Sequence, residues 1–373
     1  MLQNKIYQNF FLEILKTFLS IIAGLSIISL TVRAVNFLDL IIDNGYPLIT
    51  YFQYSFLNLF GIAPKFIPLA FIISLFIFIV KHLDDNEFII LWTSGVKKIT
   101  VTNLFFITSI FVITIYLFLS LFLTPLALNK SRSLLSNDQL NSFLPTIRAQ
   151  NFNDSFKGFT FIVDKKYKNE LKNIFLHDTG NNLKKMSSNI ENISSTTIIA
   201  KKGIVKDRVI YLLDGRIIST KGNNENEVAK FDQLNIDLGN LVTTTIKQPK
   251  LQEISTLKLL SCFLKINDDL KFCNKETKKE IFPNLIRRII LPFYIPIFAL
   301  IGSFLLLKKK NFFTNKISIM LYSFILLVLV ELFIRYTGLS YFLRLAYVFT
   351  PFVVIIFLYF FINYKFLNES KSQ

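Results

Sequence analysis

The sequence predicts an α-helical membrane protein with six transmembrane helices, three before and three after an inserted all-β domain. Composition is the first reason: 52% of the 373 residues are hydrophobic, 15% are aromatic and 18% are charged, against about 25% charged in a typical soluble domain. The second reason is that the apolar residues form long blocks near both ends of the chain. The third is that apolar and polar residues alternate in short runs in the middle.

The first third of the chain offers three candidate spans, at roughly 12–36, 55–81 and 99–127. Each contains the stretch of about 20 mainly apolar residues that a membrane-spanning helix needs. The first span has the position of a signal peptide, but the apolar run from Phe18 to Val32 is followed by no small-residue cleavage site. We therefore expect residues 1–127 to contain three retained spans.

The last quarter, residues 284–373, offers three further spans. They run at roughly 285–307, 314–334 and 342–364. The basic run Lys308 to Lys310 separates the first two, and a short turn at 335–340 separates the last two. Together with the first three, these segments give the 3+3 arrangement.

Basic residues in the short loops predict the orientation, because positively charged short loops stay in the cytoplasm. Four basic segments fall on one side of a six-span arrangement, so we expect that side to be cytoplasmic and residues 128–283 to lie outside. Arg335 and Arg344 are exceptions on the outer side. The basic segments contain Lys5; Lys81, Lys97 and Lys98; Lys308 to Lys316; and Lys365 with Lys371.

Residues 128–283 are predicted to form the β domain. Phe159, Phe161 and Val163 alternate along one candidate strand and therefore share one face. Asp214-Gly215 is typical of a two-residue hairpin turn between two strands. Five or six short strands favour a sandwich or jelly roll, and amphipathic helices at 128–143 and 254–270 are expected to connect it to the spans. The other candidate strands are 173–177, 196–201, 208–213, 216–220 and 227–238.

Charge and cysteine content restrict the function only partly. The net charge of +17 fits nucleic acid, anionic lipid or a polyanionic substrate, and equally a genome-wide bias toward Lys codons. Cys262 and Cys273 are too few for a disulfide framework, and whether they pair stays open. His82 and His177 are too far apart in sequence for a local metal-ligand pair. No P-loop sequence is present, so the chain does not bind ATP through one.

Several short segments follow one another in a specific order. Glu87 to Gly95 reads EFIILWTSG, and Pro64 and Pro68 precede it in the second span. Leu285 to Pro296, with Arg288, begins the fourth span. The middle contributes Gly158 to Val163, Ile174 to Asp178, Ile199 to Gly203 and Leu212 to Gly215. In this order the segments resemble the LptF/LptG permeases, whose members carry an E-L-x-x-x-x-x-S-G segment between spans two and three and a Pro-rich start to the second span.

The resemblance implies a permease subunit of an ABC transporter that extracts lipopolysaccharide from the bacterial inner membrane and passes it to a periplasmic bridge toward the outer membrane. It implies a periplasmic jelly-roll domain, no cofactor, and ATP hydrolysis in a separate chain. The implied partners are a cytoplasmic LptB-like ATPase dimer, a paralogous six-span permease, a membrane-anchored periplasmic LptC-like protein and lipopolysaccharide, but no nucleic acid. The segment from Arg33 to Asp39 favours LptF over LptG.

The cytoplasmic segment at about 84–97 is predicted to be a short amphipathic helix at the membrane surface. The resemblance makes it the helix that couples to the ATPase, with Glu87, Leu91, Trp92 and the C-cap residue Gly95 as its functional residues. Glu87 has an alternative role in favouring the helix N-terminus. The alternative role of Trp92 is that of an interfacial anchor. Trp92 stands where many family members carry a basic residue. Asn284, near Arg288, likewise stands where an acidic residue is common in the family.

Ionisable residues inside spans are the remaining candidates. Arg33, near the outer end of the first span, would contact the anionic lipid headgroup, because Arg recognises phosphate and carboxylate oxygens. Its alternative is snorkelling to the headgroup region. Glu331 is expected to pair with Arg335 at i+4.

Phe159, Phe161 and Val163 are expected to line a conduit for acyl chains, although a closed sandwich core has the same pattern. Two other functions stay open: a membrane-anchored receptor or scaffold, and a permease for another anionic lipid. An intramembrane enzyme is disfavoured because the sequence has no HExxH pair, no nucleophile with a nearby His and no pair of intramembrane carboxylates.

Overall fold

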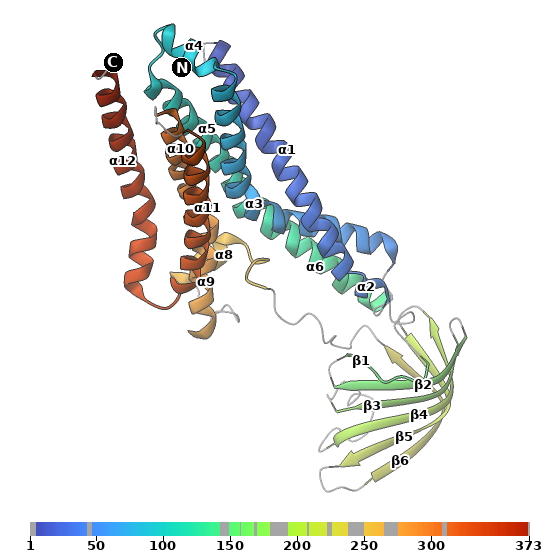
Figure 1. The fold of residues 1–373 in the computed structure, drawn as a ribbon. Coiled ribbons are helices and arrows are strands. Elements are labelled where there is room, and N and C mark those ends of the chain that lie inside the picture. Colours follow the sequence, from blue (N-terminus) through green and yellow to red (C-terminus); the bar gives the residue numbers. More distant parts are fainter. Residues whose placement is uncertain are drawn as a thin grey trace. The chain divides into compact units, whose positions relative to one another are not determined.

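The computed structural model divides into two units that we describe separately (Figure 1). A mainly helical unit comprises residues 1–32, 56–129 and 250–373, and a second unit, which contains the β-sheet, comprises residues 33–55 and 130–249. The residues described are 5–42, 47–141, 149–156, 158–167, 170–179, 193–206, 209–221, 226–237, 250–264, 275–307 and 312–371.

Among the described residues, five helical runs are long and apolar enough to cross a membrane, and a pair of helices bent by 47° supplies a sixth span if it counts as one. The predicted fold class is thereby confirmed. Before the sheet lie α1 (Lys5–Asn36), α2 (Asp39–Ile42), α3 (Leu48–Asp84), α4 (Glu87–Thr93), α5 (Lys98–Phe118), the π-helical η1 (Leu119–Leu123) and α6 (Thr124–Asn141). After it lie α8 (Thr256–Phe263), α9 (Lys275–Ile289), the 3₁₀-helical η4 (Leu291–Tyr294), α10 (Ile295–Ser303), the 3₁₀-helical η5 (Phe304–Leu306), α11 (Phe312–Tyr336) and α12 (Tyr341–Lys371).

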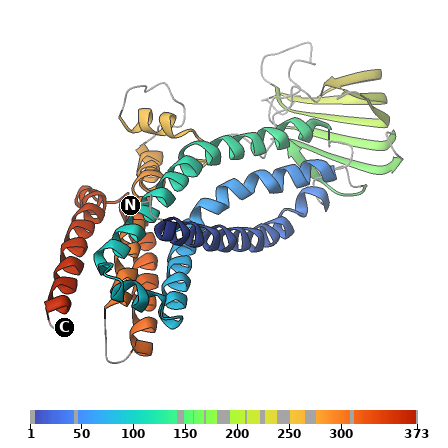
Figure 2. The ribbon, with the colours of Figure 1, turned by 90° about the horizontal axis from the view of Figure 1, so that it is seen from above.

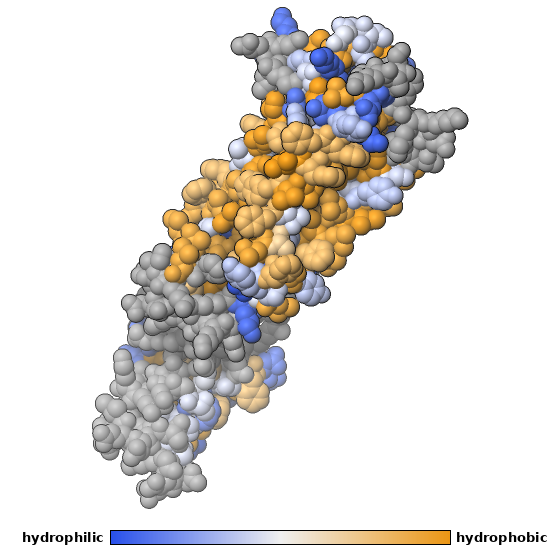
Figure 3. Space-filling view, turned by 90° about the vertical axis from the view of Figure 1, so that its left-hand side faces the viewer, coloured by the Kyte–Doolittle hydropathy of each residue, from blue (hydrophilic) through white to orange (hydrophobic). Residues whose placement is uncertain are grey.

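The spans differ in how far they are buried. In the most apolar window of α3, 61% of residues are buried, against 17% in α12 and 11% in α1. The short α10 packs against α5, α11 and α12, whereas α12 stands at the margin of the bundle (Figures 1 and 2). Figure 3 shows the exposed apolar side chains as a continuous band over the helices. In a lipid bilayer such a band faces acyl chains or other membrane helices.

Three ion pairs lie at the end of the helical unit that carries α4 and the two chain termini (Figure 1). Lys81 contacts Glu13 at 2.7 Å, Lys98 contacts Glu369 at 2.7 Å, and Lys316 contacts Asp84 at 2.6 Å. The basic loops that we expected on one side of the membrane therefore lie at one end of the bundle. The run Lys308 to Lys310 lies outside the described residues.

The prolines expected at the start of the second span lie instead in the interior of α3, which begins at Leu48. A proline lacks the N–H that would bind the carbonyl four residues earlier, so Pro64 leaves the Phe60 carbonyl without its helical donor. The Thr124 hydroxyl donates to that oxygen at 2.7 Å. In a membrane an unsatisfied carbonyl is costly, and this bond explains how α3 continues through Pro64.

The third span is not separated from the expected connector at 128–143. Helical structure runs from Lys98 to Asn141 through the π-helical turn η1. A π turn releases backbone carbonyls from the regular helical pattern, and the Leu121 carbonyl accepts a hydrogen bond from Thr256 at 3.3 Å. The second expected connector begins as α8, and its residues from 265 onward lie outside the described residues.

The described strands form one antiparallel sheet in the order β1-β2-β3-β4-β5-β6, not the two sheets of a sandwich. The predicted hairpin at Asp214-Gly215 is wrong, because both residues lie inside β5. The strands are β1 (Asn153–Phe156), β2 (Phe159–Tyr167), β3 (Glu170–Asp178), β4 (Ile193–Lys206), β5 (Val209–Lys221) and β6 (Asn226–Asp237).

A row of polar residues crosses the sheet and explains that error. On either side of the row neighbouring strands are paired, but the row residues themselves are not in the paired register. Along β3 the buried positions shift by one residue there, from Leu171 to Ile174. Asn173 and Asp214 have φ of 50° and 52°, values that Asn and Asp tolerate better than other non-glycine residues. The row consists of Asp164, Asn173, Lys201, Asp214 and Asp232.

Cys262 lies at the junction of α8 and α9. Its side chain is buried with Ile254, Leu259 and Ile281, and it is disulfide-bonded. The other cysteine of the sequence, Cys273, lies outside the described residues.

Candidate functional site

The short helix α4 is delimited by two residues with positive φ. Asn86, with φ of 59°, reverses the chain between α3 and α4. Gly95, with φ of 90°, ends α4 in a Schellman arrangement, in which the Val96 amide donates to the Leu91 carbonyl and the Gly95 amide to the Trp92 carbonyl. The helix therefore runs from Glu87 to Thr93, shorter than the predicted 84–97.

The faces of α4 differ sharply in burial. Phe88 is fully buried, and Leu91 and Trp92 are half-buried against the helical core. Ile89 and Ile90 point outward, with 56% and 65% of their surface exposed. The exposed apolar side chains are thus residues that the sequence analysis did not single out, because in EFIILWT every position after Glu87 except the last is apolar.

Glu87 contacts the buried His82 of α3. Glu87 Oε2 lies 3.2 Å from His82 Nε2, and Glu13 Oε2 of α1 lies 3.4 Å from the same nitrogen. The other oxygen of Glu13 contacts Lys81. Two carboxylates from different helices therefore converge on one imidazole, and about half of the Glu87 side chain remains exposed.

Trp92 sits beneath a cation at the other end of α4. Lys98 Nζ lies 4.8 Å from the centroid of the Trp92 ring, a cation–π distance. The same ammonium pairs with Glu369 near the end of α12. A lysine six positions after Trp92 in the sequence therefore stacks on its ring.

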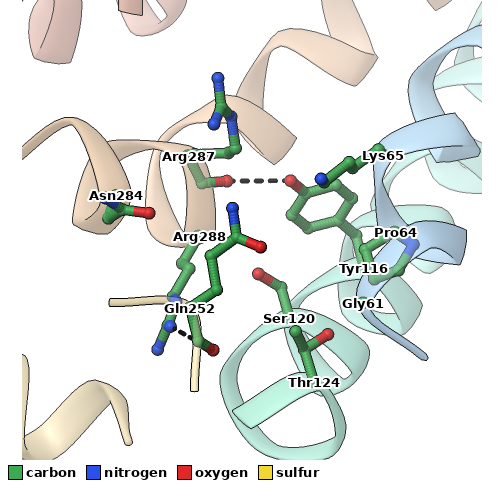
Figure 4. A pocket seen from close by; sticks show the side chains of 10 residues that line it. All are labelled: Gly61, Pro64, Lys65, Tyr116, Ser120, Thr124, Gln252, Asn284, Arg287 and Arg288. Carbon is green, nitrogen blue, oxygen red and sulfur yellow. Dashed lines mark hydrogen bonds between the residues drawn. The ribbon is translucent and has the colours of Figure 1, made fainter. Parts of the chain in front are cut away.

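A small pocket lies in the helical unit among residues of α3, α5, η1, α6 and α9 (Figure 4). Its volume of about 50 Å³ admits a few water molecules but no acyl chain. Figure 4 shows that Arg287 and Arg288 extend in opposite directions from α9. The lining residues are Gly61, Pro64, Lys65, Tyr116, Ser120, Thr124, Gln252, Asn284, Arg287 and Arg288.

Arg288 forms hydrogen bonds mainly with carbonyl oxygens of the chain's own backbone. Its side chain is buried and donates to the carbonyls of Leu251, Gln252 and Ile254 and to the Thr256 hydroxyl, at 2.9 to 3.0 Å. These bonds fasten the segment that returns from the β domain onto the start of the fourth span. Arg288 is therefore a structural anchor and not a ligand-binding cation.

Arg287 links three spans. Its guanidinium pairs with Glu331 of α11 at 3.2 Å, and its carbonyl accepts a hydrogen bond from Tyr116 of α5 at 2.9 Å. The expected pairing of Glu331 with Arg335 is not the one found. Glu331 and Arg335 are neighbours on one helix, but Glu331 lies beside α9, where Arg287 supplies the opposite charge.

Two of the three arginines expected near the outer surface, Arg344 and Arg33, differ in their contacts. Arg344 donates to the carbonyls of Thr337 and Gly338 and lies over the Phe282 ring, so it caps the end of α11. Arg33 lies in the last turn of α1 with an exposed side chain. It does not line the pocket described above.

Phe159, Phe161 and Val163 lie on one face of β2 and are buried, with at most 1% of their surface exposed. They belong to one apolar cluster that also contains residues of β3, β4, β5 and β6. The intervening Thr160 and Ile162 are half-buried. The face that would carry acyl chains is therefore closed in this structure.

Comparison with known proteins gives one result. The family model described as "Lipopolysaccharide export system permease LptF/LptG" matches residues 10–365, nearly the whole chain. No curated protein sequence matches the chain.

Proposed function

The chain belongs to the LptF/LptG family of lipopolysaccharide export system permeases, and on that basis we propose that it is one permease subunit of an ABC exporter. In this role it extracts lipopolysaccharide from the inner membrane and passes it through a periplasmic β domain to a bridge toward the outer membrane. The segment from Arg33 to Asp39 favours LptF. ATP is hydrolysed by a separate cytoplasmic ATPase dimer.

The observation that carries the proposal is the surface of α4. A seven-residue helix presents Ile89 and Ile90 to the outside while Phe88 is fully buried beneath it. The helix lies at the end of the bundle where the basic loops gather, which the positive-inside rule assigns to the cytoplasm. An exposed apolar pair on a firmly packed helix is suited to a groove on a cytoplasmic partner. We therefore assign α4 as the coupling helix.

The four predicted coupling residues have three different surroundings. Leu91 and Trp92 face the core and would hold α4 in place, and Gly95 ends it. Glu87 is half exposed and is bound to His82. Docking to the ATPase therefore falls to Ile89 and Ile90, with Glu87 at the edge of the contact.

The test is purification of the exporter from native membranes. A transporter subunit brings with it the ATPase, a second six-span permease and an LptC-like protein, whereas a receptor or scaffold does not. The variant Ile90→Asp should reduce the amount of co-purified ATPase at least tenfold, because docking would bury its charge in an apolar contact. The control Ile77→Asn alters an exposed apolar position outside α4 and should leave ATPase retention unchanged. Equal retention by both variants would contradict the docking role.

Arg33 is the proposed contact for the anionic headgroup. Arg33→Ala should weaken lipid-stimulated ATP hydrolysis more than Arg33→Lys, because Lys keeps the charge and loses the planar fork. Equal lipid affinity in all three proteins would favour snorkelling.

The conduit through the β domain requires its closed face to open. A photo-crosslinking residue at Phe161 should label lipid only while ATP is supplied, and one at Thr160, on the other face, should not. Equal labelling at both positions, or none at either during normal export, would exclude the conduit.

A further inference from the structure

His82 has surroundings that are unusual for a residue near the end of a transmembrane helix. Its side chain is buried, and the rings of Phe10, Phe78 and Phe88 lie with their centroids 4.0 to 5.7 Å from the imidazole. These rings belong to α1, α3 and α4. The imidazole therefore lies at the meeting point of the first span, the second span and the short helix α4.

The two ring nitrogens of His82 contact different helices. Nδ1 lies 2.9 Å from the Phe78 carbonyl oxygen, which only accepts, so Nδ1 carries a hydrogen. Nε2 faces carboxylate oxygens of Glu87 and Glu13 at 3.2 and 3.4 Å. The imidazole is therefore held at both nitrogens, and its Nε2 is shared by two carboxylates.

The charged groups around the imidazole come from each helix that packs on it. Glu13 belongs to α1, Glu87 to α4, and Lys81, which pairs with the second oxygen of Glu13, belongs to α3 itself. Lys81 is exposed, whereas His82 is buried. His82 is therefore the internal link and Lys81 an external one.

We infer that His82 is a positioning residue of the coupling device, which holds the first residue of α4 to the first span through the chain Glu87–His82–Glu13. This inference rests on the proposed role of α4. When the ATPase displaces α4, the imidazole ring draws Glu13 and with it α1, so motion at the cytoplasmic surface reaches the first span. The contacts of Trp92 and Lys98 hold the other end of α4 independently.

The experiment compares three variants in the purified complex of both permeases and the ATPase. His82→Phe keeps a flat ring in the aromatic cluster and removes both donors. His82→Arg supplies guanidinium donors that can reach two carboxylates. Lys81→Gln removes the exposed partner of Glu13 and serves as the matched control, because exposed ion pairs contribute little.

Two quantities are measured for each variant: amide hydrogen exchange in residues 87–96, and lipid released per ATP hydrolysed. His82→Phe should raise exchange about tenfold, most strongly at the Glu87 end, because charge-assisted hydrogen bonds that hold it are lost. Lipid released per ATP should fall about tenfold, while the ATPase stays bound. His82→Arg should recover most of both quantities, and Lys81→Gln should change neither.

Every other pattern overturns the inference. If His82→Phe leaves the lipid-to-ATP ratio unchanged, His82 is not needed for coupling, and if the ratio falls without faster exchange, His82 does not act by positioning α4. Ile90→Asp separates this result from the proposed function. If Ile90→Asp releases the ATPase and His82→Phe behaves as the parent, α4 is the coupling helix and the role of His82 is wrong; if Ile90→Asp retains the ATPase and full transport, the proposed function itself fails.

Discussion

The two ends of the helical unit each contain a buried basic side chain, but the two side chains contact different kinds of acceptor. Arg288 donates to three backbone carbonyls and one hydroxyl, all within residues 251–256. His82 faces two carboxylates from helices that are far apart in sequence. The Arg288 acceptors move as one segment, whereas the His82 acceptors belong to separate elements.

This difference indicates that Arg288 and His82 have different structural roles. A guanidinium whose donors are taken up by neutral oxygens of one segment fixes that segment in a single position. An imidazole nitrogen between two carboxylates can strengthen one contact while it weakens the other, so it tolerates relative motion of its partners. We therefore expect Arg288 to fix its segment in one position and His82 to transmit movement between α4 and α1.

The largest expected effect comes from Arg288→Met, which preserves chain length and apolar packing. It leaves buried carbonyls without donors, at about 1 to 3 kcal/mol for each group that water cannot reach, so we expect a loss of about 3 to 5 kcal/mol in stability. Arg288→Lys should recover only part, because one ammonium cannot reach all four acceptors. Thermal unfolding in detergent measures both. Unchanged unfolding of Arg288→Met would show that the return segment is held by other contacts.

An intermediate effect is expected for Glu331→Gln, which tests a cation with a single carboxylate partner. Arg287 and Glu331 are each about one third exposed, so the pair lies between the buried Arg288 anchor and a surface ion pair. Loss of the charge should cost about 1 kcal/mol, the upper end for exposed pairs. The amide keeps one hydrogen bond to Arg287. Thermal unfolding of Glu331→Gln, Arg287→Gln and the double variant gives the coupling energy, and additive effects would show that the two side chains do not interact.

The sequence predicts the spans well because each depends on local composition. Runs such as Phe18 to Val32 are apolar on every face, and only a lipid environment suits that pattern. The strand content of the middle is predicted for a similar reason, since alternation in Phe159 to Val163 is a local signal. Those features need no knowledge of what lies beside them.

The features that the sequence does not predict depend on distant partners. Glu331 has a basic residue four positions along its own helix, yet it pairs with Arg287, 44 residues away in sequence. Pro64 would end a soluble helix, but Thr124 supplies the missing donor to the Phe60 carbonyl. Asp214-Gly215 has hairpin chemistry, but the polar row that crosses five strands makes it an irregularity within β5.

The candidate site shows the same limit. Glu87 and Gly95 are visible in the sequence as the two ends of a helix, and the structure places them there. Which of the apolar residues between them face outward follows only from the packing of Phe88 beneath the helix. His82 carries no sequence signal at all, because a lone histidine near a span end is ordinarily structural.

The smallest expected effect belongs to Asp84→Asn, which removes an exposed ion pair from the same end as His82. Asp84 contacts Lys316 at 2.6 Å, but more than half of its side chain is exposed, so solvent screens the attraction and stability should fall by about 0.5 kcal/mol or less. Lipid released per ATP should stay at the parental value, because this ion pair joins α3 to α11 and not to α4. If Asp84→Asn lowered that ratio as strongly as His82→Phe, charge at this end in general, and not the shared imidazole, would control coupling. A comparison at low and high salt sharpens the distinction, since salt weakens the exposed pair and leaves the buried contacts of His82 largely unscreened.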